Sequence, residues 1–332
     1  MRILLLITFL LPTVLLAQRA FLFRNYTIEN GLSQSSVTAI QQDETYSLWI
    51  GTQDGLNRFD GHSFETFSTV NNENISNDYI KTIVKASDKK VWVGTQDGVF
   101  YYDPLYERFT KINHAFSSAL QIESIVEDKD GKIWIGSYNN GIAFVAKNAQ
   151  KVTPFLSKTT LNNITEIFQI NANELGVLSS GKYYRVNTSS KAVSHENILT
   201  DRQVKKVVLL ENGKQLVGTN KGLFLYDATT KKLNPLLQKE DIQTINYDQR
   251  YYFIGTSSNG LHVINRSNGE ITVSKKDRLN RNALEDNSIN TVFKDKSNVI
   301  WVGTNNGISN FNIYQNDFNL ISTSEFSESG LP

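Results

Sequence analysis

One short phrase, Trp-Ile-Gly-Thr or a close variant of it, recurs along the chain and contains all of its tryptophans. The clear copies hold Trp49 and Gly51, Trp92 and Gly94, Trp134 and Gly136, and Trp301 and Gly303. Three degenerate copies lie between the third and the last, with Val177, Gly218 and Gly255 at the glycine position. The phrase therefore returns every 37 to 48 residues. A period of about 40–50 residues is typical of four-stranded propeller blades, so the sequence predicts an all-β, seven-bladed β-propeller.

Each repeat divides into four short strands separated by turn residues. In the first repeat the apolar or alternating runs are 37–40, 48–51, 56–59 and 64–67, and in the third they are 122–126, 133–136, 141–145 and 152–155. Asp-Gly pairs at 60–61 and 130–131 indicate tight hairpins. Because such a sheet is apolar on both faces, it needs a neighbour on each side. Closing the stack into a ring provides one for every blade.

The recurring residues of the phrase are interpreted as structural, because a feature repeated for packing needs no ligand. We expect the tryptophan position to fill the space between adjacent blades. We expect the glycine to let neighbouring backbones approach closely and the hydroxyl after it to hydrogen-bond locally. The fourth repeat has Val177 and Leu178 at the glycine and hydroxyl positions, so it is predicted to be the least regular blade.

The sequence predicts three regions. Residues 1–17 contain Arg2, a 14-residue apolar run and Ala17, which is the layout of a secretory signal peptide. The run is shorter than the roughly 20 apolar residues that span a bilayer. The propeller is assigned to residues 18–322, and 323–332 to a linker or the start of a further, missing propeller. Residues 317–320 and 21–24 compete for the last outer strand, and we expect the amino-terminal segment to close the ring.

Composition narrows the function classes. Without Arg2 of the leader the chain has 33 basic and 33 acidic residues, so neither nucleic acid nor membrane insertion of the mature chain is expected. There is no cysteine, which excludes a disulfide framework and thiolate chemistry. The four histidines occupy different repeat positions, so no metal site is expected. No catalytic residue and no cofactor is predicted.

What remains is a binding surface. In a four-stranded blade, the turn between the second and third strands lies on the same face as the link between blades. Amides, carboxylates and one aromatic side chain in these turns suit a sugar, whose hydroxyls need donors and acceptors. Turns favour such residues whatever they bind, so this alternative stays open. The candidate ligand-binding residues at the channel mouth are Asp54, Asp97, Tyr138, Asn139, Asn140, Asn220, Asn259, Asn305 and Asn306.

The opening repeat resembles the two-component regulator propeller family, the periplasmic sensor region of hybrid two-component histidine kinases. The resemblance is carried by residues 29–33 (Glu-Asn-Gly-Leu-Ser), 37–43 and 48–61. It implies an exported, periplasmic protein followed by a second propeller, a membrane helix and a kinase. We expect none of the parts that follow the first propeller in this chain, and its ending on Gly330-Leu331-Pro332, where another family repeat would open, fits truncation after the first propeller.

The leading hypothesis is a non-catalytic sensory propeller. It would recognise a glycan-derived oligosaccharide, or dock to further propeller or sensor domains of the same polypeptide or to a homodimer partner. One alternative is a secreted polysaccharide lyase or glycosidase, which needs two ionisable side chains converging at the channel mouth. Another is a protein-interaction scaffold, which an exposed apolar patch of several hundred square ångströms would favour.

Overall fold

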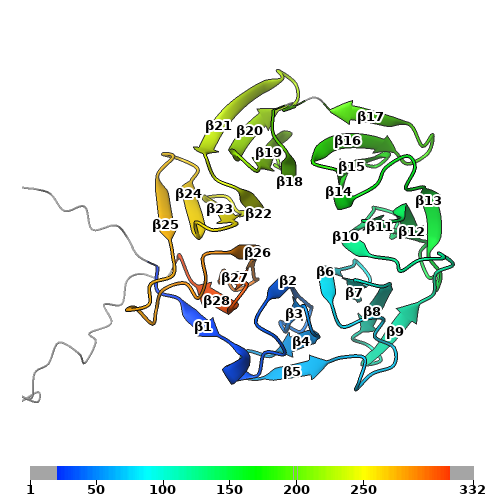
Figure 1. Ribbon diagram of the computed structural model, residues 1–332, viewed down its shortest axis with the longest axis horizontal. Helices are drawn as coiled ribbons and strands as arrows, with labels where there is room; N and C mark the ends of the chain where they lie inside the picture. The colour runs from blue at the N-terminus through cyan, green and yellow to red at the C-terminus, as the bar shows by residue number, and fades with distance from the viewer. Residues whose placement is uncertain (1–20, 197, 200, 315–332) are drawn as a thin grey trace, which may run out of the picture.

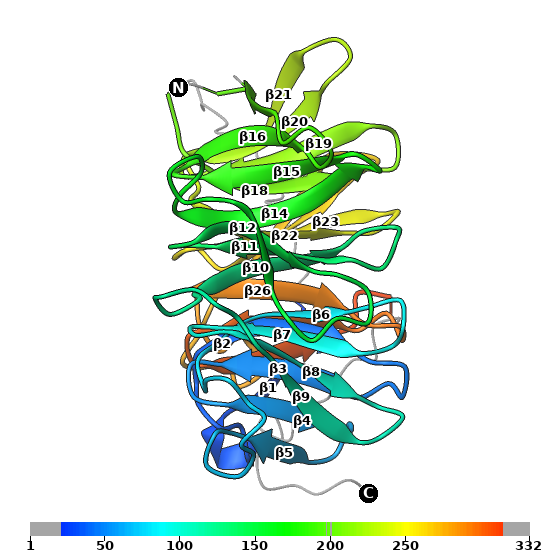
Figure 2. The ribbon, with the colours of Figure 1, turned by 90° about the vertical axis from the view of Figure 1, so that its right-hand side faces the viewer.

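The computed structural model describes residues 21–196, 198–199 and 201–314. Within them the chain forms seven four-stranded antiparallel sheets around a central channel (Figure 1), which confirms the predicted seven-bladed propeller. Figure 2 shows that the strands run along the channel axis, so the turns at their ends form two opposite faces. The predicted leader 1–17 and the segment 323–332 lie outside the described residues. No helix in the described ranges is long and apolar enough to cross a membrane.

Six blades are built from consecutive strands, and the seventh takes its outer strand from the amino terminus. The innermost strands, which surround the channel, are β2 (Val37–Gln42), β6 (Ile80–Lys85), β10 (Ile122–Glu127), β14 (Ile164–Asn171), β18 (Val204–Leu209), β22 (Ile242–Tyr247) and β26 (Ile289–Lys294). The second strands, which carry the recurring phrase, are β3 (Leu48–Thr52), β7 (Val91–Thr95), β11 (Ile133–Ser137), β15 (Glu174–Ser179), β19 (Lys214–Thr219), β23 (Tyr251–Thr256) and β27 (Ile300–Thr304).

The two outer layers complete each sheet. The third strands are β4 (Leu56–Phe59), β8 (Val99–Asp103), β12 (Gly141–Val145), β16 (Lys182–Asn187), β20 (Gly222–Asp227), β24 (Leu261–Asn265) and β28 (Gly307–Phe311). The outermost strands are β5 (Phe64–Phe67), β9 (Arg108–Ile112), β13 (Thr153–Leu156), β17 (Val193–Glu196), β21 (Lys232–Gln238), β25 (Ile271–Ser274) and β1 (Arg24–Tyr26). A single 3-10 turn, η1 (Ile28–Asn30), follows β1.

The amino-terminal strand closes the ring, as the sequence predicts. β1 pairs antiparallel with β28, with Arg24 opposite Asn310 and Tyr26 opposite Ile308 (Figure 1). The competing segment 317–320 lies outside the described residues. Closure joins the two ends of the described chain in one sheet, so blade 7 carries no unpaired outer edge on β28.

Seven apolar clusters hold the ring together, one at each interface between neighbouring blades. Trp49 is fully buried between blades 1 and 2, and its ring lies 4.7 Å from that of Tyr102. The glycine of the phrase faces the first residue of the next innermost strand. A Cβ on Gly51 would lie 2.5 Å from Cγ2 of Ile80. A larger residue at Gly51 would collide with Ile80, so the glycine of the phrase sets how closely successive blades pack.

The fourth repeat follows a register one residue later than the sequence pattern predicts. In blade 4, Ile164 pairs with Ser179 and Glu166 pairs with Leu178. At the same two positions of blade 3, the residues of the second strand are Ser137 and Gly136. Leu178, not Val177, therefore takes the glycine position, and a hydroxyl is present after all. The tryptophan position falls on Gly176, and the ring of Phe168 fills the space beside it.

This exchange affects the neighbouring interface. Because a leucine replaces the glycine, β14 and β18 approach each other at fewer positions than the other innermost strands do. The apolar cluster between blades 4 and 5 is the smallest of the seven. β14 is also the only innermost strand in the described residues with two register shifts. Blade 4 is regular in strand number and irregular in how it meets blade 5.

Candidate functional site

The turns between second and third strands and the links between blades form one face, which we call the linker face. Backbone hydrogen bonds run between these turns and links around the channel, for example Gly55 N to Asp78 O at 2.8 Å and Gly307 N to Ser35 O at 2.7 Å. All nine predicted ligand-binding residues lie on this face. The structure uses most of their side chains, however, to fasten the links.

Blades 2 and 3 illustrate this use. The Asp97 carboxylate accepts the backbone N–H of Leu120 at 3.0 Å, and His114 Nε2 lies 3.8 Å from it. The side-chain nitrogens of Asn139 and Asn140 both donate to the carbonyl of Ala119, at 2.9 and 3.0 Å. These groups therefore order the link between blades 2 and 3, and their remaining hydrogen-bonding capacity is small.

The same holds on the far side of the ring. Asn259 donates to Glu240 at 2.9 Å, and Asn306 donates to Glu285 at 2.9 Å. Asn305 accepts from Asn290 at 2.8 Å and donates to Ser288 at 3.0 Å. These three amides connect each turn to the link beside it, so they shape the linker face rather than project from it.

Three predicted residues are more available. Tyr138 exposes 42% of its surface, which leaves an aromatic side chain free on the linker face. Asp54 is exposed, and its backbone N–H donates to Oγ1 of Thr52 at 3.1 Å, while its carboxylate accepts no hydrogen bond from the described residues. Asn220 accepts the backbone N–H of Gln203 at 3.0 Å and keeps its side-chain nitrogen for other contacts. These side chains can contact a ligand without breaking the links.

The wall of the channel was missed by the sequence prediction. Every innermost strand has a bulge at its second residue, where the register with the next strand shifts by one. A bulge leaves that residue unpaired and re-aims its side chain. Six of the seven bulge residues line a channel cavity of about 210 Å³. The bulge residues are Thr38, Lys81, Glu123, Thr165, Lys205, Gln243 and Asn290.

Ionisable side chains meet in this channel, as paired charges. Lys81 Nζ lies 3.2 Å from Oε1 of Glu123, across the boundary between blades 2 and 3. Lys206 pairs with Glu166 across the boundary between blades 4 and 5, and the other oxygen of Glu166 accepts the backbone N–H of Val207 at 3.2 Å. The wall thus presents ammonium donors and carboxylate acceptors together. A polyhydroxylated ligand can accept hydrogen bonds from the ammonium groups and donate hydrogen bonds to the carboxylates.

Hydroxyl and amide bulge residues connect blades directly. Thr38 donates from Oγ1 to the carbonyl of Ile80 at 2.8 Å. Asn290 donates to the carbonyl of Val37 at 3.0 Å, across the boundary where blade 7 meets blade 1. The bulges therefore have two effects: they fasten neighbouring blades and they set polar groups in the channel.

The four histidines do not form a common site in the described part of the chain, where no cluster of metal-ligating side chains occurs. His62 lies in the turn before β5 and His195 on β17. His262 on β24 is 5% exposed, with Nε2 3.8 Å from Oε1 of Glu240. Burial lowers the pKa of His262, because the charged imidazolium is poorly solvated there, and the nearby Glu240 opposes this only in part.

A larger hollow of about 930 Å³ lies on the opposite face, where the turns between first and second strands gather. Its wall includes the Asp248 carboxylate, which accepts from Lys294 at 2.9 Å and from the hydroxyl of Tyr314. Burial raises the pKa of Asp248. Hydrogen bonds from Tyr314, Lys294 and two backbone N–H groups outweigh burial, so the net pKa is lowered. The carboxylate is fixed by these donors and links blades 6 and 7.

The geometry defines a closed seven-bladed β-propeller with a polar channel. A model described as the two-component regulator propeller matches residues 31–54, 117–139 and 283–306, in and beside blades 1, 3 and 7. The family resemblance of the first repeat is thereby confirmed, and these three segments match two-component regulator propeller repeats. Histidine kinase P4 of Formosa agariphila is 55% identical over 47 residues, which is 14% of this chain and 3% of that protein.

Solved structures share the fold. The extracellular domain of a protein described as a hybrid two-component system from B. thetaiotaomicron superposes with a TM-score of 0.76 at 23% identity, over 88% of this chain and 42% of that one. Virginiamycin B lyase from Staphylococcus aureus gives 0.70 at 12% identity, over 88% and 99%. The chain thus spans less than half of the matched extracellular domain and almost all of the lyase.

Proposed function

We propose that this chain is the exported, periplasmic sensory propeller of a hybrid two-component regulator, and that its linker face and channel receive a glycan-derived oligosaccharide. The single observation that carries the proposal is the occurrence of two-component regulator propeller repeats in a closed ring. The leader-like residues 1–17 support export. A stretch of 47 residues that is similar to this chain makes up 3% of Histidine kinase P4, which supports membership of a larger sensor polypeptide.

The chemistry of the linker face supports the ligand class. Sugar hydroxyls both donate and accept hydrogen bonds, and their ring faces pack on aromatic side chains. The channel offers Lys81 and Glu123 as donor and acceptor, and the exposed ring of Tyr138 lies on the same face. An oligosaccharide end entering the channel would meet these groups together.

The propeller in this proposal changes no covalent bond. Binding would favour one placement of the propeller relative to the domains that follow it, a shift of population toward a signalling state. The docking version of the proposal places a further sensor domain, or a second copy of this chain, on the same face. In the described part of the chain, the exposed large apolar side chains come from different loops, among them Val70, Leu105 and Leu279. A polar contact is therefore favoured over an apolar one.

Two lysines on one strand provide a matched test. Lys81 lies at the linker-face end of β6 with Glu123, and Lys85 lies at the other end of the same strand with Glu44, 2.5 Å away. Isothermal titration against a panel of plant and algal oligosaccharides is expected to detect binding in the wild type. Lys81→Met should weaken that binding about tenfold or more, as loss of one charged hydrogen bond predicts, and Lys85→Met should leave it unchanged.

The outcomes separate the versions of the proposal. No binding to any member of the panel, or equal effects of the two variants, would reject the channel as an oligosaccharide site. Sedimentation velocity then tests docking between copies. A concentration-dependent dimer that is lost in Tyr138→Ala would support docking on the linker face, and a monomer at all concentrations would reject self-docking.

One observation favours a second candidate, a polysaccharide lyase or glycosidase. Two carboxylates, Glu123 and Glu166, line the same channel cavity, and the fold is shared with a lyase along nearly its whole length. Both carboxylates are held by lysines. Incubation with polysaccharides, followed by assays for new reducing ends and unsaturated sugars, tests this candidate. Product formation that Glu123→Gln abolishes would establish it in place of the sensory function.

A further inference from the structure

The four blades that carry a tryptophan contain the same turn between the first and second strands, on the face opposite the linker face. In each, the residue six positions before the tryptophan starts the turn. The backbone N–H of this residue donates to the carbonyl four residues later in the chain. The distance between the nitrogen and that oxygen is 3.0 Å for Asp43, 2.9 Å for Ala86, 2.9 Å for Asp128 and 3.0 Å for Asp295. The fourth residue has a positive φ in all four turns, from 65° to 77°. The four turns therefore share one backbone conformation.

In three of these turns an aspartate carboxylate occupies the interior. In blade 1, Oδ1 of Asp43 accepts the backbone N–H groups of Thr45 and Ser47, at 2.8 and 3.1 Å. Its Oδ2 accepts the indole Nε1 of Trp49 at 2.8 Å. Asp128 and Asp295 repeat all three contacts in blades 3 and 7. The turn is thus a small carboxylate receptor with an aspartate of its own chain bound in it.

Blade 2 keeps the turn but lacks this carboxylate, because Ala86 stands at the aspartate position. Oδ1 of Asp88 accepts the backbone N–H of Lys90 at 3.2 Å, the contact that Asp43 makes with Ser47 in blade 1. Trp92 is only 6% exposed, and its Nε1 has no hydrogen-bond partner among the residues that the structure describes. Ala86 and Trp92 both line a cavity of about 150 Å³. A buried donor without a partner lowers the free energy of unfolding by about 1–3 kcal/mol. In the turns of blades 1, 3 and 7, a carboxylate oxygen accepts the indole hydrogen bond and removes this cost.

We propose that the cavity between blades 2 and 3 is a binding site for the carboxylate of a small acidic ligand, which accepts the hydrogen bond of Trp92 in place of the missing aspartate. The volume exceeds that of a bare carboxylate, so part of the group that carries the carboxylate also fits. The site lies on the face opposite the linker face, and it does not depend on the function proposed for that face.

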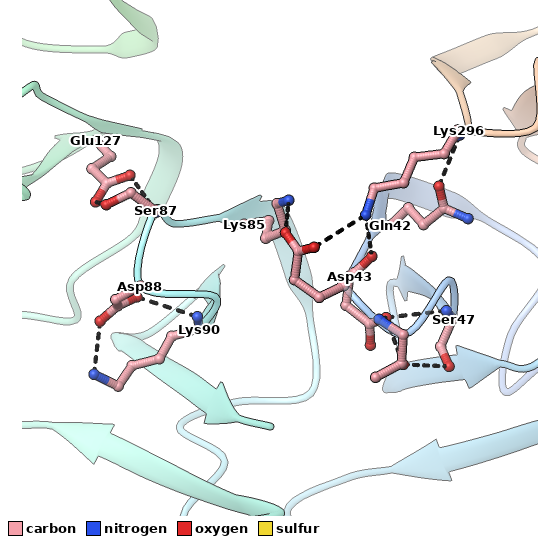
Figure 3. A network of polar contacts seen from close by, with 11 residues as sticks. Gln42, Asp43, Ser47, Lys85, Ser87, Asp88, Lys90, Glu127 and Lys296 are labelled. Carbon is pink, nitrogen blue, oxygen red and sulfur yellow. Dashed lines mark hydrogen bonds and ion pairs between the residues drawn. The ribbon is translucent and has the colours of Figure 1, made fainter. Parts of the chain in front are cut away.

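The charges around the cavity are compatible with an incoming carboxylate. Lys90 Nζ pairs with Asp88 at 2.7 Å, and Ser87 donates its N–H and hydroxyl to Glu127, at 2.7 and 2.6 Å (Figure 3). Each resident carboxylate therefore has donors of its own. Lys147 also lines the cavity. Two lysines balance the two acidic residues, so a ligand carboxylate meets no uncompensated negative charge.

The filled turn of blade 1 serves as a reference beside the site. Figure 3 shows Asp43 and Ser47 of the filled turn near the ion pairs of Lys85 and Lys296, and the blade 2 turn with Asp88 and Lys90 next to it. Because the two turns have the same backbone conformation, the substitution Ala86→Asp is expected to place a carboxylate of the chain itself beside the Trp92 indole. This variant is therefore the matched control for occupation by a ligand.

Thermal unfolding of the full chain in sodium acetate and in sodium chloride, at equal pH and ionic strength, tests the proposal. Near saturation, at about ten times the dissociation constant, acetate should raise the Tm of the wild type by about 2–4 °C relative to chloride. Ala86→Asp should have a higher Tm in chloride and no further response to acetate. Trp92→Phe should lose the response. An equal acetate response in all three proteins, or none in the wild type, would overturn the proposal.

Ligand-observed NMR on the wild type provides a test that needs no variant. Saturation transfer is expected to glucuronate and not to glucose, which lacks the carboxylate. Transfer to acetate but not to glucuronate would support the receptor and exclude a uronic acid as its source. Transfer to glucose as strong as that to glucuronate, or transfer to none of the three, would refute a site built for a carboxylate.

Discussion

The indole Nε1 of Trp49 donates a 2.8 Å hydrogen bond to Oδ2 of Asp43, six residues earlier in the chain. The bond connects the layer between blades, where the indole packs, to the turn at the edge of the ring. Trp134 and Asp128 repeat it at 2.8 Å, and Trp301 and Asp295 at 2.9 Å. A residue of the apolar interface therefore also fixes the turn that starts its own strand.

Removing the aspartate should cost more than the loss of one surface charge. Asp43 is 1% exposed and accepts four hydrogen bonds. Asp43→Ala is expected to lower the free energy of unfolding by about 3 kcal/mol, because Trp49 and two backbone N–H groups lose their acceptor inside the protein. Urea denaturation measures the loss. Asp88→Ala, in the equivalent turn of blade 2, is the control and should cost less than about 1 kcal/mol; similar losses would contradict this role.

Ring closure depends on one aromatic side chain of the amino-terminal strand. The ring of Tyr26 lies 5.2 Å from that of Phe59 in blade 1 and 6.1 Å from that of Trp301 in blade 7. Tyr26→Ala should lower the free energy of unfolding by about 3–4 kcal/mol, because it empties a buried site shared by two blades. Limited proteolysis should then cut near β1 first. Tyr46→Ala, at a side chain 63% exposed, should have little effect, and a wild-type cleavage pattern in Tyr26→Ala would argue against the closure role.

The fold could be predicted because its main determinants recur in the sequence at a readable interval. Tryptophan and glycine positions mark the interfaces, and four strands fit between successive marks. The fourth repeat shows the limit of this approach. There the apolar residues shift by one, and only the pairing of Glu166 with Leu178 reveals which residue stands at the glycine position. Pattern alone does not specify register where several neighbouring residues are apolar.

The candidate site was less predictable, for two physical reasons. Asn and Asp in turns satisfy local backbone groups as readily as ligands, and Asp97 and Asn139 do so here. The bulge residues, such as Lys81 and Glu123, follow an ordinary β-branched residue in an ordinary strand. Their place in the channel becomes visible only when the register shift is known. A repeat-by-repeat comparison of the second residue of each innermost strand would have revealed their mixed polarity.

The contact between Gly51 and Ile80 should behave as a coupled pair. A Cβ at Gly51 would lie 2.5 Å from Cγ2 of Ile80, so Gly51→Ala is expected to cost about 1–3 kcal/mol through overpacking. Ile80→Ala alone leaves a cavity and should cost about 2–5 kcal/mol. The double variant should lose at least about 0.5 kcal/mol less than the sum, because the new methyl group occupies part of the cavity. Urea denaturation of the four proteins gives this coupling energy.

Ile122 provides the matched control for that cycle. It holds the position of Ile80 one blade further on, where it faces Gly94 instead of Gly51. Combining Gly51→Ala with Ile122→Ala should therefore give losses that add within about 0.5 kcal/mol. Additivity in both cycles would mean that the glycine does not set the spacing between blades.

His262 should make the stability of the protein depend on pH. Burial lowers its pKa below the ordinary value of 6.5, Lys275 adds to the lowering and Glu240 opposes it. In the unfolded chain the imidazole regains an ordinary pKa, so at mildly acidic pH the unfolded state binds more protons than the folded state. Stability from the neutral imidazole is therefore full above pH 6.5 and is lost as the pH falls toward the folded-state pKa.

Urea denaturation between about pH 8 and pH 5 reports this dependence. His262→Gln keeps a polar side chain without a titrating ring, so its free energy of unfolding should fall less steeply over this range than that of the wild type. His62→Gln, at an exposed turn position, is the control and should keep the wild-type slope. Equal slopes in the two variants would show that His262 is not held neutral by burial. A shallower slope in His262→Gln alone assigns the acid sensitivity to β24, beside the link that carries Glu240.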